Sequence, residues 1–408
     1  MKISGRYLVV VIAMCGLAAA TVGLTTNVAG LFFTPMAEEF GVMQGTASLT
    51  LTISNICVAL GGLATRRLTK LVPLRVLLIA GVAILAGSAL GTAWAPSVSV
   101  AYLLAATRGL AGGIIGFVLI TYVLNKWFVA QLGLATSVAM GFSGLAGALF
   151  TPLIQPVVTN MGWRAGYVLL AVLTVILSLP AILFVPSCDP GDVGLRPLGA
   201  EDEPAQTQAA GQGKKPPIKV DHLLWAVVVV YASLAGAISA MPQHFPGVAT
   251  EAGLAASVGA GMISACMVAN TLGKIFMGWL IDRIGAKNSI FAFTAIVAAA
   301  IVALFLVHVP AAFIVAATAY GLCYARATVG VTMMCREVFG KRGFGIVYPV
   351  AALGTSFANA IFSAAVGFGY DLTGGYAVSL FTFLAFLVGS FFLVQWCYAA
   401  KDARKTAA

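Results

Sequence analysis

The chain has 408 residues, of which 23 are Lys or Arg and 13 are Asp or Glu, while 61% are apolar. Soluble domains carry about 25% charged residues, so a chain with 9% has too little polar surface for a soluble enzyme, a disordered chain or a collagen-like fibre. The net charge of +10 does not by itself indicate nucleic-acid binding, because no basic cluster lies on a polar face. Lipid must therefore cover much of this protein.

Hydropathy divides the chain into twelve apolar segments, each close to the roughly 20 residues that cross a membrane as a helix. In chain order they are 7–33, 47–65, 76–94, 98–122, 131–157, 165–185, 223–245, 254–281, 288–307, 311–334, 343–368 and 376–399. Turn residues or charges separate them, as at Pro35 with Glu38 and Glu39, at Pro73 and at Pro96. An open sheet would leave backbone groups unpaired in lipid, and a barrel would show short alternating strands. The pattern therefore predicts an all-α membrane protein.

The first segment is expected to be a retained helix. Lys2 and Arg6 precede it as in a signal peptide, but the apolar run continues to Phe33, which is too long for an h-region. Positive residues are enriched on the cytoplasmic side of membrane proteins. With the N-terminus in the cytoplasm, nearly all Lys and Arg lie in cytoplasmic segments, and one, Arg164, lies in an outer loop. We therefore predict a multi-pass protein of the plasma or inner membrane with both termini in the cytoplasm.

The tryptophans all fall at segment ends, where an interfacial aromatic belt would place them. They are Trp94, Trp127, Trp163, Trp225, Trp279 and Trp396.

The longest polar stretch, 186–222, contains Pro, Gly, Gln and mixed charge and is typical of a flexible cytoplasmic linker. It separates an N-terminal half, 1–185, from a C-terminal half, 223–408, each with six segments. The halves echo each other after their second segments, where both contain a glycine followed by basic residues. Two related halves with a cavity between them at the membrane midplane are the architecture of a secondary transporter.

The residues Gly278 to Lys287 resemble the signature G-x-L-x-D-R-x-G-x-K of the major facilitator superfamily. Gly278, Asp282, Arg283 and Gly285 occupy its motif positions. The resemblance covers essentially the whole chain and implies twelve helices in two pseudo-symmetric six-helix halves around a central cavity.

The first-half copy of this signature is degraded. Arg66 remains, but Thr65 stands where the family has an acid, which weakens the charge contact that the resemblance would otherwise imply for that half. Arg108 with Gly112 resembles a second, shorter family motif in the fourth segment.

Four stretches resemble the monocarboxylate porter and oxalate/formate exchanger branch of the superfamily. They are 30–41, Trp127-Phe128, 192–197 and 270–278. In that branch a basic residue on helix eight holds the substrate carboxylate, and the resemblance assigns this role to Lys274, with Asn270 one turn earlier on the same face. Two features of the branch are missing: a second basic residue within 343–368, and an acid on helix one.

The predicted membrane interior contains three cations, Arg108, Lys274 and Arg326, while every acid lies in a loop, a tail or at a helix end. Each cation would cost about 2.5–3.5 kcal/mol if it faced lipid. A wet cavity removes most of that cost, and an anionic ligand removes more. The charge pattern therefore favours an anionic substrate.

Each candidate also has a structural interpretation. Arg108 is next to glycines and is compatible with a packing or gating role, and Lys274 lies near enough to the cytoplasmic end of its helix to snorkel. Arg326 is too deep to do so. Tyr122 lies on roughly the same helical face as Arg108 but suits an interfacial tyrosine, and Asn270 would also serve as an interhelical hydrogen-bond donor.

Other polar residues favour structural roles. His244 is more consistent with a solvated rim than with a proton-sensitive gate, and Thr21 and Thr25 suit bonds back to their own helix. Gly112 and Gly116 form a small-xxx-small pattern that predicts close helix packing.

The sequence contains no H-E-x-x-H or G-x-S-x-G motif and no nucleotide-binding loop, so we expect no enzyme activity, no cofactor and no metal. We predict a secondary transporter of small organic anions, with monocarboxylates as the expected class. Lys274 and Arg326 would meet the carboxylate near the midplane, and Arg108 would complete a positive field. An exporter of neutral or amphiphilic compounds and a non-transporting membrane sensor remain alternatives. Direction, coupling to a proton or a counter-anion, and oligomeric state stay open.

Overall fold

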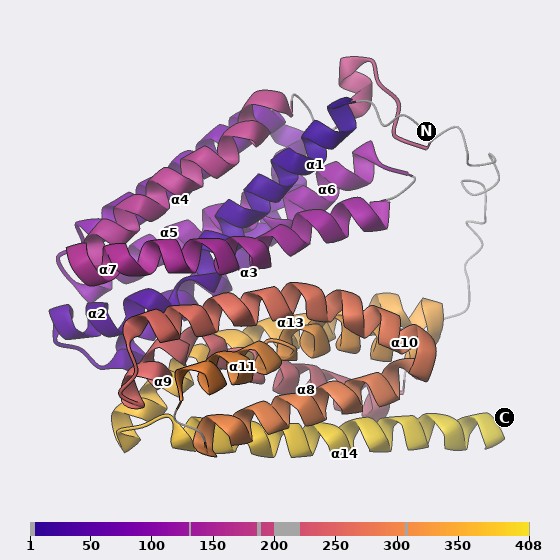
Figure 1. Cartoon of the computed structure of the whole chain (residues 1–408). Coiled ribbons are helices and arrows are strands. Elements are labelled where there is room, and N and C mark those ends of the chain that lie inside the picture. Colours follow the sequence, from indigo (N-terminus) through magenta and orange to yellow (C-terminus); the bar gives the residue numbers. More distant parts are fainter. Residues whose placement is uncertain (1–4, 130–131, 186–188, 200–220, 307–308, 408) are drawn as a thin grey trace. The chain divides into compact units, whose positions relative to one another are not determined.

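A computed structural model describes the chain except for residues 1–4, 130–131, 186–188, 200–220, 307–308 and 408 (Figure 1). The described residues form helices throughout, apart from turns and one isolated bridge between Phe128 and Leu198. The predicted all-α fold is confirmed.

Ten helices of the described chain are long and apolar enough to cross a membrane. Two of them contain a glycine with left-handed backbone, Gly162 (φ 85°) and Gly285 (φ 80°), and each glycine divides its helix in two, which gives the predicted twelve. Gly340 (φ 67°) divides the tenth helix from the eleventh in the same way. Because only glycine adopts this conformation at little cost, these three residues take the place of loops.

In chain order the elements are α1 (Gly5–Ala18), η1 (Ala19–Asn27), α2 (Gly30–Phe40), α3 (Gln44–Leu71), α4 (Leu74–Ala93), α5 (Val98–Ile115), α6 (Phe117–Trp127), α7 (Leu132–Phe184), η2 (Pro190–Val193), α8 (His222–Ile238), η3 (Met241–His244), α9 (Phe245–Glu251), α10 (Ala256–Leu306), α11 (Pro310–Tyr320), α12 (Cys323–Ala325), η4 (Arg326–Gly330), α13 (Val331–Thr373) and α14 (Ala377–Ala407). Two of these elements, η1 and η4, are π-helical.

The ends of several helices follow the predicted breaks. Ser97 caps α5 by accepting from the backbone N–H of Val100, and Pro310 begins α11. The predicted break between 33 and 47 is present but shorter, because α2 runs through Pro35 to Phe40, and its C-cap Gly41 is left-handed with a φ of 61°. Pro35 removes one helical hydrogen bond, whereas the glycine lets the chain reverse.

The contacts group the chain into two compact units. Unit 1 comprises 1–27, 53–147 and 161–217, and unit 2 comprises 28–52, 148–160 and 218–408. Two segments that are continuous with the N-terminal helices, 28–52 and 148–160, therefore pack with the C-terminal helices. The predicted division into 1–185, 186–222 and 223–408 stays a prediction.

The core of unit 1 brings together α1, α4, α5 and α6. Trp127 is 1% exposed and packs edge-to-face on Tyr7, with ring centroids 6.1 Å apart. Trp163 is buried as well. These two indoles therefore pack inside the protein, and their place at the membrane interface stays a prediction.

Close packing in unit 1 depends on Gly109 and Gly113, whereas the predicted pair was Gly112 and Gly116. A Cβ added at Gly113 would lie 2.1 Å from the Val58 carbonyl oxygen, and one at Gly109 would lie 2.2 Å from that of Ser54. At Gly112 the nearest atom is 3.7 Å away, an ordinary contact. The backbones of α3 and α5 therefore touch along Gly109-x-x-x-Gly113.

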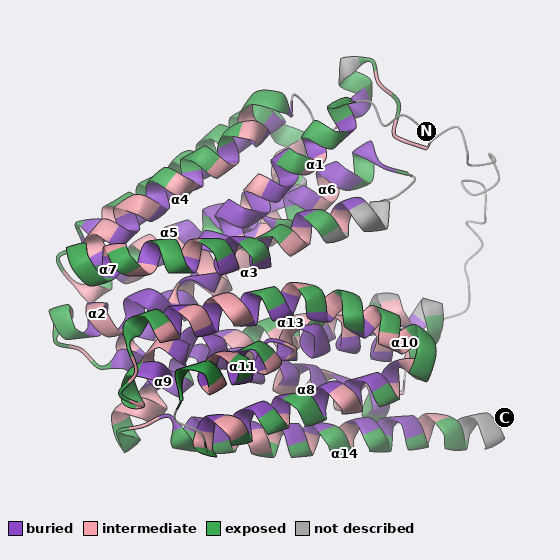
Figure 2. Cartoon of the chain, in the orientation of Figure 1, coloured by how far each residue is buried: buried purple, intermediate pink, exposed green. Residues whose placement is uncertain are grey.

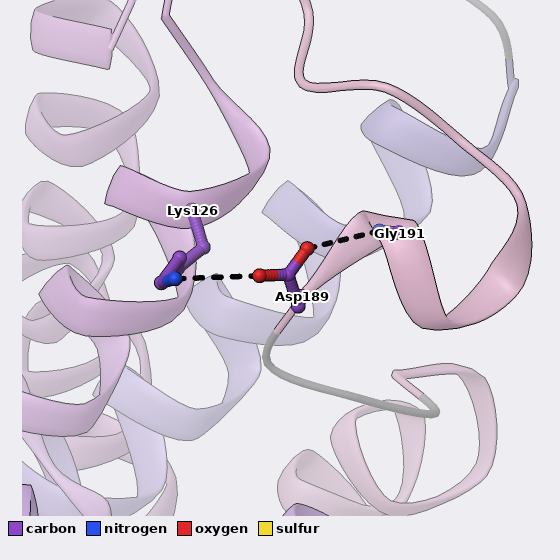
Figure 3. Close-up of polar contacts among 3 residues, drawn as sticks. All are labelled: Lys126, Asp189 and Gly191. Atoms are coloured by element: carbon purple, nitrogen blue, oxygen red, sulfur yellow. Dashed lines mark hydrogen bonds and ion pairs between the residues drawn. The ribbon is translucent and has the colours of Figure 1, made fainter.

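The first part of the predicted linker is docked onto unit 1. Lys126, at the end of α6, pairs with Asp189 at 3.3 Å, and the Asp189 carboxylate also accepts from Gly191 N–H at 3.0 Å (Figure 3). Leu198 N–H donates to the Trp127 carbonyl at 2.9 Å. A flexible tether was therefore the wrong expectation for 189–199, since its apolar side chains and backbone find partners; 200–220 lie outside the described residues.

In unit 2, α8 packs against α13 and α14, and α10 packs against α11. Their inward faces are buried and many of their outward faces are exposed (Figure 2). The exposed faces carry large apolar side chains such as Leu272, Ile275 and Phe381. Such surfaces are stable in contact with lipid.

Candidate substrate site

Arg326 begins the π-helical segment η4 and is 0% exposed. Its Nη1 donates to the Thr294 hydroxyl of α10 at 3.4 Å, at the limit of a hydrogen bond, while its Nε and Nη2 have no hydrogen-bond partner among the described residues. Tyr231 of α8 lies nearby, and its hydroxyl also lacks a partner. A π-helical segment inside an α-helix is often found at a functional site. Arg326 is thus a buried cation with unused donors.

Lys274 lies on α10 and is partly exposed. No acidic side chain among the described residues lies within ion-pair distance of Lys274, Arg326 or Arg108. Asn270, one turn before Lys274, is 6% exposed; its amide nitrogen contacts the Met267 sulfur at 3.9 Å, and its oxygen has no partner. The predicted interhelical bond of Asn270 is therefore absent among the described residues, whereas Asn359 makes one, to the Gly236 carbonyl at 3.4 Å.

Arg108 of α5 belongs to unit 1 and is 7% exposed. Its guanidinium lies 5.4 Å from the centroid of the Tyr167 ring, a cation–π distance, and its Nε has no hydrogen-bond partner. Tyr122 of α6 is partly exposed. Lys274, Asn270 and Arg326 thus belong to unit 2, and Arg108 and Tyr122 to unit 1; their common role in one site remains a prediction.

The signature residues form the connection between two helices of unit 2. Gly278 has open space around its Cα, Asp282 and Arg283 are exposed, and Gly285 provides the turn. The Arg283 guanidinium lies 4.3 Å from the centroid of the Trp279 ring. The side chain of Arg66, in the first-half copy, lies outside the described residues.

Sequence analysis missed an acid next to this signature. Glu337 accepts from the Ala286 backbone N–H at 3.2 Å through one oxygen and from the Tyr398 hydroxyl at 2.8 Å through the other. A carboxylate at a helix N-terminus is stabilised by the helix dipole. Glu337 thereby holds three helices of unit 2 together at the signature turn. Glu337 lies far from Gly285 in the sequence, so no local pattern predicts this contact.

A model of the Major Facilitator Superfamily matches residues 15–363 of the chain. The chain belongs to the Major Facilitator Superfamily. Members of the Major Facilitator Superfamily are transporters, so this protein is a multi-pass membrane transporter and not an enzyme. The predicted family and the twelve-helix, two-domain fold are confirmed.

One curated superfamily relative, Monocarboxylate transporter 13 of Bos taurus, is 23% identical over 293 residues, which cover 69% of this chain and 65% of the relative. The match thus spans about two thirds of that relative's length.

Two solved superfamily structures share the fold at 13% identity. A bacterial homologue of the human lysosomal transporter Spinster, inward-facing and unoccupied, has a TM-score of 0.68 and covers 98% of this chain and 99% of its own. A mutant of the nucleoside transporter NupG has a TM-score of 0.73 and covers 95% of this chain and 100% of its own. These likenesses concern the fold alone.

Proposed function

We propose that this transporter moves small organic anions, with monocarboxylates as the expected class, by alternating access. The observation that carries the proposal is the Arg326 guanidinium, which is fully buried and which, within the part of the chain that the structure describes, has two nitrogens without hydrogen-bond partners and no acid at ion-pair distance. A carboxylate can accept two parallel hydrogen bonds from one guanidinium. Anion binding would therefore offset the cost of burying this cation.

Lys274 is the natural first contact, because its side chain is partly exposed while Arg326 is closed off. In this mechanism the carboxylate reaches the ammonium first, and a local rearrangement of the π-helical segment then brings Arg326 toward it. The unpartnered Asn270 oxygen is an acceptor for a hydroxyl on the substrate. Arg108 and Tyr122 would complete the site from unit 1.

Two further considerations support the anion class. A carboxylate is the ligand that an interior with cations and no acid recognises best, and the curated relative is named as a monocarboxylate transporter. We also propose that both termini face the cytoplasm, in accordance with the distribution of Lys and Arg.

The test is counterflow in proteoliposomes with a panel of labelled monocarboxylates, dicarboxylates, nucleosides and neutral amphiphiles. We expect saturable exchange of one or more carboxylates. Lys274→Ala and Arg326→Ala should each reduce it, whereas Lys70→Ala, which removes an exposed cation at the end of α3, should not.

Three outcomes would overturn the proposal. If both variants still exchanged carboxylates normally, Lys274 and Arg326 would not form the substrate site. Exchange of nucleosides or amphiphiles alone would favour an exporter of neutral compounds, and carboxylate binding without any flux would favour a sensor.

A further inference from the structure

The segment 28–52 is fastened to the rest of unit 2 by the carboxylate of Asp371. Its two oxygens accept from the backbone N–H groups of Gln44 at 2.9 Å and Gly45 at 2.7 Å, at the start of α3. These are donors that a helix leaves unpaired in its first turn. Asp371 lies on α13, so one side chain caps a helix from a distant part of the chain.

Tyr376 and Gln243 add to this fastening. The Tyr376 hydroxyl donates to the Gln44 amide oxygen at 2.7 Å, and the Gln44 amide nitrogen donates to the Thr34 hydroxyl at 2.9 Å. At Gly30 a Cβ would lie 1.8 Å from the Gln243 carbonyl oxygen, so α2 and η3 touch through their backbones. We call these contacts, made by Gly30, Gln44, Gln243, Asp371 and Tyr376, the clasp.

His244 lies inside the clasp and is 1% exposed, which contradicts the predicted solvated rim. Its ring centroid lies 5.4 Å from that of Phe33 and 5.9 Å from that of Tyr376. Its Nε2 is 2.8 Å from the Ser363 carbonyl oxygen. The histidine became buried because η3 turns its polar residues inward against α2 and α13.

The protonation state of His244 follows from this contact. A carbonyl oxygen only accepts, so Nε2 must carry the hydrogen, and in the neutral ring Nδ1 is then the bare nitrogen. Nδ1 has no hydrogen-bond partner among the described residues. A second proton on Nδ1 would create a buried imidazolium whose new N–H has no protein acceptor, which is costly while the clasp stays closed.

The titratable groups on the elements around His244 do not supply that acceptor. They are Tyr376 and its neighbours Tyr370, Glu251 and Asp371, then Tyr320 and Tyr324 on α11 and α12, and the exposed Glu38 and Glu39 on α2. Glu251 accepts from the Tyr376 backbone N–H at 2.9 Å, and Asp371 accepts from the two amides of the clasp. Both acids therefore hold backbone amides and do not contact the imidazole.

We propose that His244 is a proton-binding site and that a proton on it opens the clasp. This rests on the proposed transport function, because it makes one step of the transport cycle depend on acidity. Opening would let water solvate Nδ1–H. Acid should then favour release of 28–52 from the rest of unit 2.

The experiment is hydrogen–deuterium exchange of peptides within 28–52, measured in the purified protein in nanodiscs between pD 8 and pD 5.5. His244→Gln is the matched variant, because its amide nitrogen can still donate to the Ser363 carbonyl but cannot take a second proton. Comparing the two proteins at each pD cancels the chemical dependence of exchange on acidity. One titrating group shifts a two-state opening by at most about tenfold per pH unit.

We expect the exchange of the wild-type segment to rise toward this limit as the pD falls, relative to the variant, and to be equal in the two proteins at pD 8. Asp371→Asn is the positive control, since it weakens the cap and should raise exchange at every pD. If wild type and His244→Gln respond alike while Asp371→Asn exchanges faster, the proposal is overturned. If Asp371→Asn has no effect, the clasp does not hold 28–52, and the proposal also falls.

The result is independent of the cargo. Acid-dependent opening that is lost in His244→Gln would stand even if no carboxylate were exchanged in proteoliposomes. Carboxylate exchange with no acid-dependent opening would leave the transport function standing and remove His244 from it.

Discussion

Arg164 in unit 1 and Arg326 in unit 2 are both cations packed among helices, the first half-buried and the second fully buried, and their surroundings differ. Arg164 donates to the Ala93 carbonyl at 2.7 Å and to the Ala95 carbonyl at 3.2 Å from both Nη atoms, and it lies 4.6 Å from the Trp163 ring centroid. Arg326 makes one hydrogen bond, of 3.4 Å, to the described residues and leaves two nitrogens without a partner among them.

The difference separates a structural cation from a candidate ligand-binding one. Arg164 satisfies carbonyls that the C-terminus of α4 leaves free, so its charge is useful without any ligand. Arg326 is costly to bury as it stands. A buried cation that lowers the stability of this state is therefore expected to have a favourable interaction in another state or with a ligand.

The largest expected effect is that of Arg326→Met. Removing the guanidinium should weaken carboxylate binding by about 2–3 kcal/mol, roughly 100-fold, and yet raise the melting temperature, because an apolar side chain replaces an unpaired buried charge. Counterflow and thermal unfolding in detergent measure the two effects. Arg326→Lys, which keeps the charge, should fall between. A variant that transports normally but melts earlier would make Arg326 a structural residue like Arg164.

Arg164→Met should have the opposite profile. The loss of its bonds to carbonyls should cost about 2 kcal/mol of unfolding free energy, with carboxylate exchange per folded molecule unchanged. Denaturant unfolding combined with counterflow tests this. Arg164→Lys is the control, and it should recover only part of the stability because a lysine cannot form the same fork of donors. If Arg164→Met lost exchange but kept its stability, Arg164 and Arg326 would no longer differ in role.

Thr294→Val should have a smaller effect. Among the described residues its hydroxyl is the one hydrogen-bond acceptor for Arg326, but the bond is long, and the hydroxyl also donates to the Ile290 carbonyl at 2.7 Å. We expect a change in substrate affinity of less than about fivefold, in line with the modest worth of one weak hydrogen bond. A change as large as that of Arg326→Met would mean that Thr294 itself meets the substrate. Titration with labelled substrate distinguishes the two.

The smallest effect concerns the exposed pair of Lys126 and Asp189 (Figure 3). The backbone N–H of Gly191 lowers the pKa of Asp189, and Lys126 lowers it further, against an opposing effect of burial. A lowered pKa stabilises the fold above the pKa of the unfolded chain and loses that contribution as pH falls below about 4.

Because both side chains are nearly half exposed, Asp189→Asn should cost only about 0.5 kcal/mol or less. The loss should become smaller in acid, as the wild-type carboxylate begins to take up a proton. Unfolding at pH 7 and pH 3 checks this, and an equal loss at both values would contradict it.

Much of the fold was predictable because apolar segment length is a strong local signal. The twelve helices followed from it, and the signature at Gly278–Lys287 followed from its residue pattern. The continuation of α2 through Pro35 and the burial of Trp127 did not, since both depend on what packs around them. The docking of 189–199 depends on partners such as Lys126 and Trp127 that lie far away in the sequence.

The candidate site was predictable in its residue types and less so in its geometry. The absence of acids in the interior singled out Arg108, Lys274 and Arg326. The sequence places Arg164 between segments and Arg326 deep within one, but it does not show which of them finds carbonyl partners, because those of Arg164 come from another helix. His244 was misread for the same reason, because a histidine near a segment end looks solvated until α2 covers it.

The helix reversals at Gly162, Gly285 and Gly340 have a practical consequence for anyone mapping which side of the bilayer each segment faces. With no loop at these joins, proteases find little extended backbone to cleave, and an inserted tag or fused reporter would disrupt a turn that has no spare residues. Topology reporters belong instead in turns such as that at Pro96. A negative proteolysis result at the three glycines would say nothing about sidedness.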